Sequence, residues 1–376
     1  MITRTLGQTG IRVSVVGFGG MRFFNRDEAE AEAKATVRRC VEKGITFFET
    51  GSYGGGRSEE VLGKALWEVT RRDQVVLADK AAVADFPSAA AVSAAMEASL
   101  RRYRTDYFDV FNFWGTNTPE MHEHILRAGL LDEVLRAKEE GLVRAIGLTT
   151  HARPEWIRDF VEVYPWDCVV LKEHLLYSRN QELIAHLADR GIGVVVMTPL
   201  AGGVVAHPGA AIREMLTQAG TTPAVLGLRY LVANPGVSSA ISGMTTPDEI
   251  DENVRAGAIE GPLTATELGL IDEIRRRTSA LGERFCTSCG YCMPCPQEVN
   301  IPGIFRLWNL QRGYGNDAYS RLEYQKLCEQ RHWADFPGAS AEHCVECGLC
   351  ETKCPEGLPI IADLKKAHAD LTAPQS

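Results

Sequence analysis

The amino-acid sequence predicts an α/β protein: a TIM-type (β/α)8 barrel followed by a smaller, mainly α-helical domain. Three observations lead to this prediction. Short apolar runs alternate with segments of helical periodicity eight times over about 260 residues, the number and length typical of such a barrel. The first strand-to-helix turn lacks a G-x-G-x-x-G motif, which disfavours an open dinucleotide-binding sheet. From residue 284 onward the composition changes to cysteine, proline and aromatic residues.

The predicted strands are short and apolar, and several end on a polar or aromatic residue. They span residues 13–18, 45–48, 74–80, 106–114, 143–148, 168–171, 191–197 and 238–242. Helical periodicity follows at residues 28–43, 58–67, 88–102, 122–138, 154–163, 180–189, 223–232, 247–256 and 262–281. A doubly wound open sheet stays an alternative, because periodicity does not show whether a sheet closes. We place the boundary between domains 1–283 and 284–376.

Composition limits the location and the partners of the protein. The 376-residue chain is 45% hydrophobic, which is enough for a substantial core, and its formal net charge is -9. A negative charge argues against nucleic-acid binding as the main task. The N-terminus lacks the apolar core of a signal peptide, and no run of 18 or more apolar residues occurs. We therefore expect a cytoplasmic protein without a membrane span.

Eight of the eleven cysteines fall into two short runs near the C-terminus. The first run is Cys286-x2-Cys289-x2-Cys292-x2-Cys295-Pro, and the second is Cys344-x2-Cys347-x2-Cys350-x3-Cys354-Pro. The second run matches the pattern of bacterial ferredoxins, and the first has one residue fewer before its last cysteine. In a reducing compartment, such runs indicate metal ligation.

The spacing of the cysteines favours two 4Fe-4S clusters. Two-residue gaps let one tight turn present successive thiolates to one cubane, and in two-cluster ferredoxins the fourth cysteine ligates the other cluster. By this logic Cys354 joins the first three cysteines of the first run, and Cys295 joins the first three of the second. Zinc and disulfides are the alternatives. Zinc usually has four ligands in two pairs, whereas each run here has four cysteines.

A second group of candidate residues surrounds residues 45–54. There an apolar run leads into a glycine-rich turn containing Glu49 and Tyr53, while Lys80 and Trp114 end two later strands. In a barrel these strand ends meet at one face. A free tyrosine has a pKa of about 10, but a nearby ammonium favours the phenolate, and a carboxylate keeps that ammonium charged. The three groups would form a proton donor to a carbonyl oxygen that receives a hydride.

At these residues the sequence resembles the aldo/keto reductase family. The matching segments are residues 48–54 (FETGSYG), 60–66 (EVLGKAL), 144–147 (RAIG), 199–203 (PLAGG), 242–243 and 252–253. The resemblance extends over about residues 3–260, and residues 286–302 resemble the ferredoxin-type extension of one branch of that family. It implies a TIM barrel, NAD or NADP as cofactor, a small-molecule substrate and carbonyl reduction.

The family's catalytic tetrad of Asp, Tyr, Lys and His is only half kept. Tyr53 and Lys80 match it. The Asp position holds Glu49, which is one methylene longer and can still pair with Lys80. The His position holds Trp114, whose indole N–H only donates hydrogen bonds. Strand alternation places Asn112 on the same face as Trp114, where it offers a second polar group.

The cofactor positions depart from the family as well. Thr149-Thr150 replaces Ser-Asn, and Met197 stands in place of a stacking tyrosine. Glu249 occupies a position where a basic residue usually meets a 2′-phosphate, so NAD suits the site at least as well as NADP. The resemblance places cofactor contacts at Thr149, Thr150, Leu200, Gly202, Gly243, Met244, Glu252 and Asn253. His151 and His174 follow strands at the same face, and with Lys172 and Glu173 they indicate a polar pocket.

Three functions are compatible with these features. The first is an NAD(P)-dependent carbonyl reductase or alcohol dehydrogenase with Tyr53 as the acid/base. The second is a barrel enzyme without ordinary nicotinamide chemistry: a lyase, isomerase or epimerase, or a redox enzyme fed by the clusters. The third is a non-catalytic electron-transfer or regulatory subunit. A 4Fe-4S cluster passes one electron at a time and a hydride carries two, so the clusters are either structural or relay electrons to a partner protein.

Overall fold

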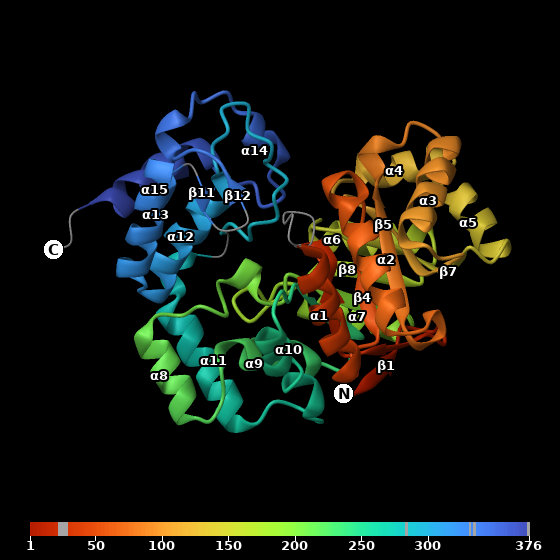
Figure 1. Ribbon diagram of the computed structural model, residues 1–376, viewed down its shortest axis with the longest axis horizontal. Coiled ribbons are helices and arrows are strands. Elements are labelled where there is room, and N and C mark those ends of the chain that lie inside the picture. Colours follow the sequence, from red (N-terminus) through yellow and green to blue (C-terminus); the bar gives the residue numbers. More distant parts are fainter. Residues whose placement is uncertain (22–28, 283–284, 331, 334–335, 374–376) are drawn as a thin grey trace. The chain divides into compact units, whose positions relative to one another are not determined.

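The structure is a computed structural model and describes residues 1–21, 29–282, 285–330, 332–333 and 336–373 (Figure 1). The chain divides into two compact units. The first unit consists of Met1–Glu173, Ser178–Pro199 and Leu228–Pro262, and the second of His174–Tyr177, Leu200–Gly227 and Leu263–Ser376. Within the described ranges, no helix is both long enough and apolar enough to cross a membrane.

Eight strands of the first unit form a closed barrel in the order β10-β3-β4-β5-β6-β7-β8-β9. All neighbours in the barrel pair in parallel, including β10 with β3. The closure confirms the predicted TIM barrel and excludes the open sheet. The strands are β1 (Thr3–Thr5), β2 (Arg12–Ser14), β3 (Val16–Gly19), β4 (Phe47–Glu49), β5 (Val76–Ala82), β6 (Phe108–Trp114), β7 (Val143–Thr150), β8 (Cys168–Lys172), β9 (Gly193–Met197), β10 (Ser239–Ser242), β11 (His332–Trp333) and β12 (Phe336–Pro337).

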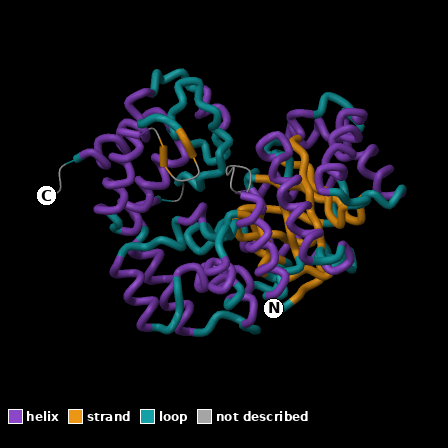
Figure 2. The backbone as a smooth tube through the Cα atoms, in the orientation of Figure 1, coloured by secondary structure: helices purple, strands orange, loops and turns teal. Residues whose placement is uncertain are grey.

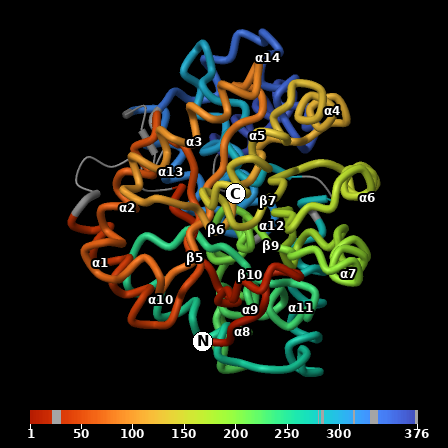
Figure 3. Tube along the Cα trace, turned by 90° about the vertical axis from the view of Figure 1, so that its right-hand side faces the viewer, coloured from red at the N-terminus to blue at the C-terminus, as the bar shows by residue number. Residues whose placement is uncertain are grey.

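Helices surround the barrel strands, as the colouring by secondary structure makes clear (Figure 2). Seen from the side, α1 lies between α2 and α10 (Figure 3). The helices are α1 (Ala29–Glu42), α2 (Arg57–Val69), α3 (Ala89–Tyr103), α4 (Pro119–Arg127), α5 (Leu130–Glu139), α6 (Pro154–Val163), α7 (Gln181–Asp189), α8 (Ala210–Gln218), α9 (Pro223–Val232), α10 (Pro247–Asn253), α11 (Ala265–Arg277), α12 (Ile301–Tyr314), α13 (Asp317–Gln330), α14 (Leu349–Lys353) and α15 (Ile360–Thr372).

Side chains from alternate strand positions fill the barrel. Ala78 of β5 and Val110 of β6 belong to this interior core, together with Leu6 and Val13 from the β1–β2 hairpin. The hairpin therefore closes the N-terminal end of the barrel. Because side chains alternate along a strand, the next inward positions toward the C-terminal ends carry the polar and aromatic candidates. The sequence pattern thus leaves the C-terminal end for chemistry.

A glycine of β7 makes room for a polar contact across the interior. The thiol of Cys168 donates to Asn112 Oδ1 over 3.6 Å. Gly147 pairs with both residues in the sheet, and a Cβ on it would lie 2.3 Å from Asn112 Oδ1 and 2.4 Å from Cys168 Sγ. Asn112 therefore faces inward as predicted, but its oxygen is engaged within the barrel core.

Two predicted elements are wrong in their extent. The strand predicted at residues 13–18 is divided into β2 and β3, because the hydroxyl of Ser14 donates to the carbonyl of Val16 over 2.8 Å and fixes a bend there. The helix predicted at residues 122–138 is divided into α4 and α5, because Gly129 adopts a left-handed conformation with φ of 67°. The predicted helix start at residue 28 and the domain boundary between residues 283 and 284 lie outside the described residues.

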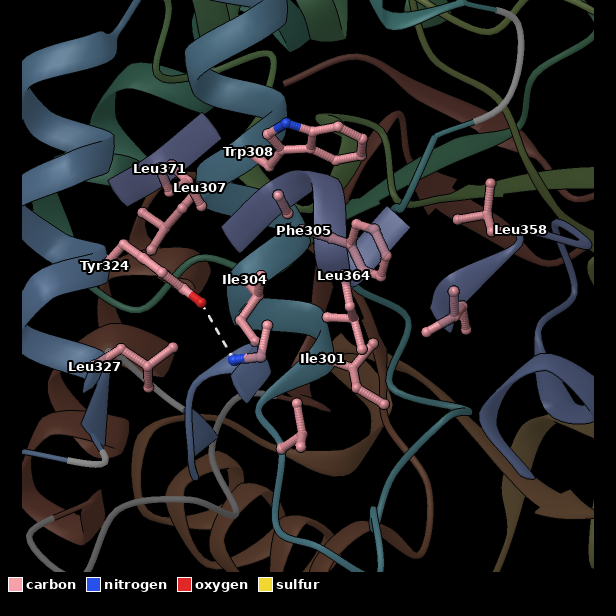
Figure 4. Close-up of a cluster of buried hydrophobic side chains, with 14 residues drawn as sticks. Ile301, Ile304, Phe305, Leu307, Trp308, Tyr324, Leu327, Leu358, Leu364 and Leu371 are labelled. Atoms are coloured by element: carbon pink, nitrogen blue, oxygen red, sulfur yellow. Dashed lines mark hydrogen bonds between the residues drawn. The ribbon is translucent and has the colours of Figure 1, made fainter. Parts of the chain in front are cut away.

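The second unit has an apolar core of its own, which is mainly helical (Figure 4). Ile304 and Phe305 of α12, Tyr324 of α13 and Leu364 of α15 are buried in it. The backbone N–H of Ala341 donates to the Tyr324 hydroxyl over 3.2 Å, the dashed line in Figure 4. Cysteines of both runs pack against this core: Cys286, Cys292, Cys295, Cys344, Cys350 and Cys354.

We predict that Gly147→Ala destabilises the barrel by about 1–3 kcal/mol, the usual cost of overpacking a filled core. The new methyl group would meet two side chains and, at 2.7 Å, the backbone carbonyl of Cys168, which has little freedom to move. Gly19→Ala is the matched control, because a Cβ on that barrel strand has no neighbour nearer than 3.6 Å. Chemical denaturation followed by tryptophan fluorescence measures both. Equal unfolding midpoints for the two variants would contradict the prediction.

Candidate active site and cysteine-lined cavities

The four candidates from the strand ends meet at the C-terminal end of the barrel. Glu49 ends β4 and Trp114 ends β6, Lys80 lies in β5, and Tyr53 begins the 3-10 turn after β4. The Lys80 ammonium forms an ion pair with Glu49 Oε1. The same nitrogen lies 5.1 Å from the centre of the Tyr53 ring, and the centres of the Tyr53 and Trp114 rings are 5.2 Å apart. A carboxylate, an ammonium, a phenol and an indole therefore share one site.

Burial governs the charge of Lys80. The side chains of Lys80 and Glu49 are only 6% and 4% exposed. Burial lowers the pKa of Lys80 to about 7, and the carboxylate of Glu49 acts in the opposite direction by favouring the ammonium. Gly51 leaves space for the lysine, because a Cβ there would lie 2.8 Å from Lys80 Cγ. The lysine is thus confined to one position beside the phenol.

The turn that carries Tyr53 is built from three glycines, residues 54–56, all with positive φ. Only glycine adopts this conformation without strain. Arg102 of α3 packs against the turn, since a Cβ on Gly56 would lie 2.4 Å from Arg102 Nε. Arg102 also forms an ion pair with the buried Glu59 of α2. Helix α3 therefore holds the turn that positions the phenol.

A buried acid links the same helices to the strand of Lys80. Asp79 of β5 is fully buried, and the Tyr103 hydroxyl donates to its Oδ1 over 3.3 Å. Burial, together with the neighbouring Glu59, raises the pKa of Asp79 well above its ordinary value. Ser99 donates to Glu59 Oε1 over 3.0 Å. Through this network β5, α2 and α3 hold Lys80 and the tyrosine turn in one arrangement.

His151 brings an imidazole close to the same lysine. It follows β7, where its backbone N–H donates to Asn117 Oδ1 over 2.8 Å. Burial, together with the charges of Lys172 and Lys80, lowers the pKa of His151 to about 3. The imidazole is therefore neutral at physiological pH. Of the residues from which a polar pocket was predicted, His151, Lys172 and Glu173 belong to the first unit and His174 to the second, and the pocket stays a prediction.

The two threonines at the end of β7 differ in their availability. The Thr150 hydroxyl donates to the carbonyl of Thr116 within hydrogen-bond distance and accepts from Ala152 N–H at 2.9 Å, so it serves the loop. The Thr149 hydroxyl is buried and has no hydrogen-bond partner in the described part of the chain. Buried polar groups are almost always paired. Thr149 Oγ1 is thus a group that a ligand would satisfy, as expected for a cofactor carboxamide.

The remaining predicted cofactor positions fall into two places. Ser242, the last residue of β10, accepts a hydrogen bond at its Oγ from Asn253 Nδ2 of α10 over 3.0 Å. Glu252 precedes Asn253 in α10. After the strand, Gly243 is exposed and Met244 is buried. Leu200 and Gly202 lie in the loop after β9, in the second unit.

The loop after β9 is strained. Thr198 and Ala201 both have φ of 51° although neither is glycine, and Gly202 and Gly203 have φ of 66° and 97°. Strained backbone of this kind gathers at ligand sites. The cofactor contact at Gly202 stays a prediction.

The cysteines of the second unit line two cavities, and each cavity draws on both runs. The first cavity is lined by Cys286, Cys289, Cys292 and Cys354. The second is lined by Cys295, Cys344, Cys347 and Cys350, and also by Cys292. Burial raises the pKa of Cys286 well above its ordinary value, and Cys289, Cys292 and Cys354 interact with it electrostatically. These four cysteines therefore line one cavity, the combination expected from the crossed pattern.

The donor set fits an iron–sulfur cluster. In the described residues, no three His, Cys, Asp or Glu side chains stand close enough together to hold a single metal ion. A 4Fe-4S cubane is wider than an ion and is held by four thiolates, which each cavity offers. Asn309 Nδ2 also donates to the carbonyl of Cys286 over 2.9 Å and fixes the loop.

Some residues of the sites have no signal in the sequence. Arg102 reaches the tyrosine turn from α3, and Arg306 of α12 lies against Gly203 in the loop after β9. Each contact joins segments that are far apart in the chain, so neither periodicity nor motif spacing reveals it.

Comparison with known proteins agrees with this geometry. Residues 15–276 match the model of the aldo/keto reductase family. The chain belongs to the aldo/keto reductase family. This aldo/keto reductase carries a further match at residues 285–358, to the 4Fe-4S dicluster domain. The matches confirm the resemblance to the aldo/keto reductase family and to its ferredoxin-type extension, and they identify the protein as an oxidoreductase with a ferredoxin-like extension.

Relatives of this aldo/keto reductase cover its barrel. It is 31% identical over 288 residues to L-galactose dehydrogenase of Arabidopsis thaliana. The matched segment covers 67% of this chain and 87% of that protein. It is 27% identical over 290 residues to an uncharacterized oxidoreductase, YqkF, of Bacillus subtilis, covering 68% and 91%. Among solved structures, the holo form of aldo-keto reductase AKR11C1 from Bacillus halodurans is similar, with 26% identity, a TM-score of 0.63, and coverage of 73% and 96%.

We predict that Glu49→Gln lowers the free energy of unfolding by about 3 kcal/mol at pH 7, because it leaves the buried Lys80 without its counter-charge. The pKa of Lys80 is lower in the folded chain than in the unfolded one, so stability from this group rises as pH increases from about 7 to about 10.4. The loss in the variant should therefore shrink toward pH 10. Glu60→Gln, an exposed position of α2, is the control. Denaturant titration at pH 7 and at pH 10 measures the free energy of unfolding of each variant. The same loss in Glu49→Gln at both pH values would contradict the prediction.

Proposed function

We propose that this aldo/keto reductase interconverts a carbonyl compound and an alcohol with NAD or NADP, and that Tyr53 is the general acid/base. The observation that supports this most directly is the buried Lys80 ammonium between the Glu49 carboxylate and the Tyr53 ring. A buried charge at this place has a chemical use beside a phenol, since it favours the negative form that remains after proton transfer.

When bound, the nicotinamide would supply or accept the hydride. In the direction of reduction, Tyr53 donates its hydroxyl proton to the carbonyl oxygen as negative charge develops there. Lys80 stabilises the phenolate that remains, and Glu49 orients the ammonium. In the direction of oxidation, the phenolate takes the proton of the alcohol. Trp114, whose ring lies against that of Tyr53, excludes water from the phenol and donates a hydrogen bond to the substrate.

His151 supplies a second neutral donor near Lys80. A neutral imidazole polarises a carbonyl without competing for its proton, which is the property that the family's histidine would have at the position of Trp114. With Lys172 it makes the pocket strongly polar. A polyhydroxylated or otherwise polar carbonyl substrate suits such a pocket, and one relative is named L-galactose dehydrogenase.

The cofactor contacts proposed for the nicotinamide end are Thr149 and Thr150, and for the adenine end Gly243, Met244, Glu252 and Asn253. The Glu249 side chain accepts from the backbone N–H groups of Thr245 and Thr246, so an acid is held at the start of α10. A carboxylate there disfavours a 2′-phosphate. We therefore favour NAD over NADP.

Two 4Fe-4S clusters are proposed for the ferredoxin-like extension. Cys286, Cys289, Cys292 and Cys354 would hold the first, and Cys295, Cys344, Cys347 and Cys350 the second. The clusters either support the fold of the second unit, whose apolar core they adjoin, or pass electrons to a partner protein. The division into domains 1–283 and 284–376 stays part of this proposal.

We predict that Tyr53→Phe lowers kcat for carbonyl reduction by about 10²–10⁴-fold, the usual share of general acid catalysis, and leaves cofactor affinity unchanged. Steady-state oxidation of NADH and NADPH with a panel of aldehydes and aldose sugars measures the rate. Tyr107→Phe is the control, because Tyr107 precedes β6 and stacks on Arg72 at 3.7 Å.

A Tyr53→Phe enzyme as active as the wild type would contradict the role of the phenol. Failure of the wild type to bind either cofactor would exclude nicotinamide chemistry and favour a lyase, isomerase or cluster-fed reaction. In the same assay, Trp114→Phe and His151→Phe distinguish the two donors, since only the variant of the acting donor should lose rate.

We predict that Cys354→Ser removes the first cluster and keeps the second, so that iron falls from about eight to about four per chain. Its residual electron paramagnetic resonance spectrum should match that of Cys289→Ser, although the two cysteines belong to different runs. Cys328→Ser, which lines neither cavity, should keep all its iron. A spectrum matching that of Cys347→Ser instead would refute the crossed ligation.

A further inference from the structure

A cavity opens between helices α2 and α3 of the first unit, which lie side by side (Figure 1). Its volume is about 700 Å³, within the range of about 300–1,000 Å³ that small-molecule sites occupy. Gly55, in the turn that carries Tyr53, belongs to its lining. The cavity therefore adjoins the turn of the proposed acid/base, and none of the residues assigned to the substrate, the cofactor or the clusters lines it.

The lining of this cavity is strongly basic. Five of its side chains are cationic and one is a carboxylate, that of Glu60, although the chain as a whole has a net charge of -9. Like charges held close together repel one another, so this cavity favours the entry of an anion. The cations come from α2 and from the C-terminal end of α3: Arg57, Lys64, Arg101, Arg102 and Arg104.

The acids at the rim of the cavity do not remove this excess of positive charge. Glu97 lies 3.6 Å from Arg101, but the two side chains are 62% and 70% exposed, and ion pairs at such exposure contribute little. Glu68 interacts electrostatically with Lys64, yet its carboxylate already pairs with Lys34 at 2.6 Å. Positive charge is thus left for a ligand to neutralise.

Arg102 presents its guanidinium to the cavity in a fixed position. Its Nε forms an ion pair with the buried Glu59, and its Nη2 donates to Ser99 Oγ over 3.0 Å. Among the described residues, these contacts leave Nη1 for a ligand, and a Cβ on Gly55 would meet no atom within 4 Å. A ligand can therefore approach both the guanidinium and the backbone of the tyrosine turn.

From this geometry we propose that the cavity binds a small molecule with two or more adjacent phosphate groups. Four of the five cations are arginines, and a guanidinium presents parallel N–H donors that match two oxygens of a phosphate. Five cations and one carboxylate leave an excess of four positive charges, which a single phosphate group of charge about -2 does not balance. A nucleic-acid strand would need an extended positive surface, which a chain of net charge -9 does not favour.

A ligand in this cavity would act on the active site, because the cavity and the phenol share one turn. Gly55 follows Tyr53 by two residues, and Arg102 packs against Gly56 of the same turn. A phosphate held between Arg102 and Gly55 would restrict the turn, so the polyphosphate is an effector of Tyr53. Only this consequence for turnover rests on the proposed function, and binding itself does not.

The test is isothermal titration calorimetry of cluster-loaded protein with inorganic triphosphate, ATP and orthophosphate, without Mg²⁺. Triphosphate and ATP should bind the wild type at least about tenfold more tightly than orthophosphate. Arg101→Gln and Lys64→Gln should each raise their Kd about fivefold or more, because each removes a charged hydrogen-bond donor. Arg127→Gln is the matched control: like Arg101, Arg127 is 76% exposed and pairs with a glutamate four residues earlier, but on α4.

Hydrogen exchange measures the effect on the turn. Triphosphate should slow exchange in the peptide that contains residues 51–58 of the wild type, and should do so less in Arg101→Gln at the same concentration. Tighter binding of ATP than of triphosphate would identify a nucleotide as the natural ligand, and equal affinity would identify the phosphates alone as the recognised group.

Three outcomes would overturn the proposal. Equal Kd values for Arg101→Gln and Arg127→Gln, or equal affinity of the wild type for triphosphate and orthophosphate, would refute the site. Unchanged exchange in a wild type that binds triphosphate would refute the effect on the turn. Because neither measurement follows turnover, failure of the proposed carbonyl reduction would be recognised separately, in the steady-state assay, and would leave the site standing.

Discussion

The buried pair of Lys80 and Glu49 is the interaction on which the active-site end of the barrel depends. Two opposite charges at 6% and 4% exposure are costly to bury, and a buried pair is poor evidence of a need for stability alone. Its surroundings are built to keep it. Gly51 leaves space for the lysine, and the network of Asp79, Glu59 and Arg102 holds the helices beside it. The Lys80 ammonium is thereby held in a fixed position beside the Tyr53 ring.

The departures from the family tetrad gain a consistent interpretation from this pair. Glu49 reaches the ammonium despite its extra methylene, so the carboxylate function is kept. Trp114 does not replace the family's histidine as a hydrogen-bond acceptor, but its ring packs on that of Tyr53. The neutral His151, which follows β7, lies near Lys80. The polar groups thus gather around the same lysine, and the site keeps the elements that the proposed carbonyl reduction requires.

The barrel, and the meeting of the four central residues at one of its ends, could be predicted from the sequence alone because both depend on local sequence patterns. Eight strand–helix alternations specify the barrel, and residues at strand ends must meet at its C-terminal face. The cysteines expected to share a cluster, which line a common cavity, followed from cysteine spacing in the same way. What the sequence did not reveal depends on contacts between distant segments: the break of one helix at Gly129, the Arg102 contact with Gly56, and Arg306 against Gly203. No periodicity records which long side chain crosses to a glycine on another element.

The most direct test of the central claim is isotopic. Cluster-loaded enzyme is incubated with a panel of aldehydes and aldose sugars and with NADH or NADPH that carries deuterium at C4 of the nicotinamide. Direct hydride transfer predicts deuterium on the carbinol carbon of the product, at a rate that collapses in Tyr53→Phe. Product without deuterium, or reduction that proceeds equally well without the phenol, would contradict it.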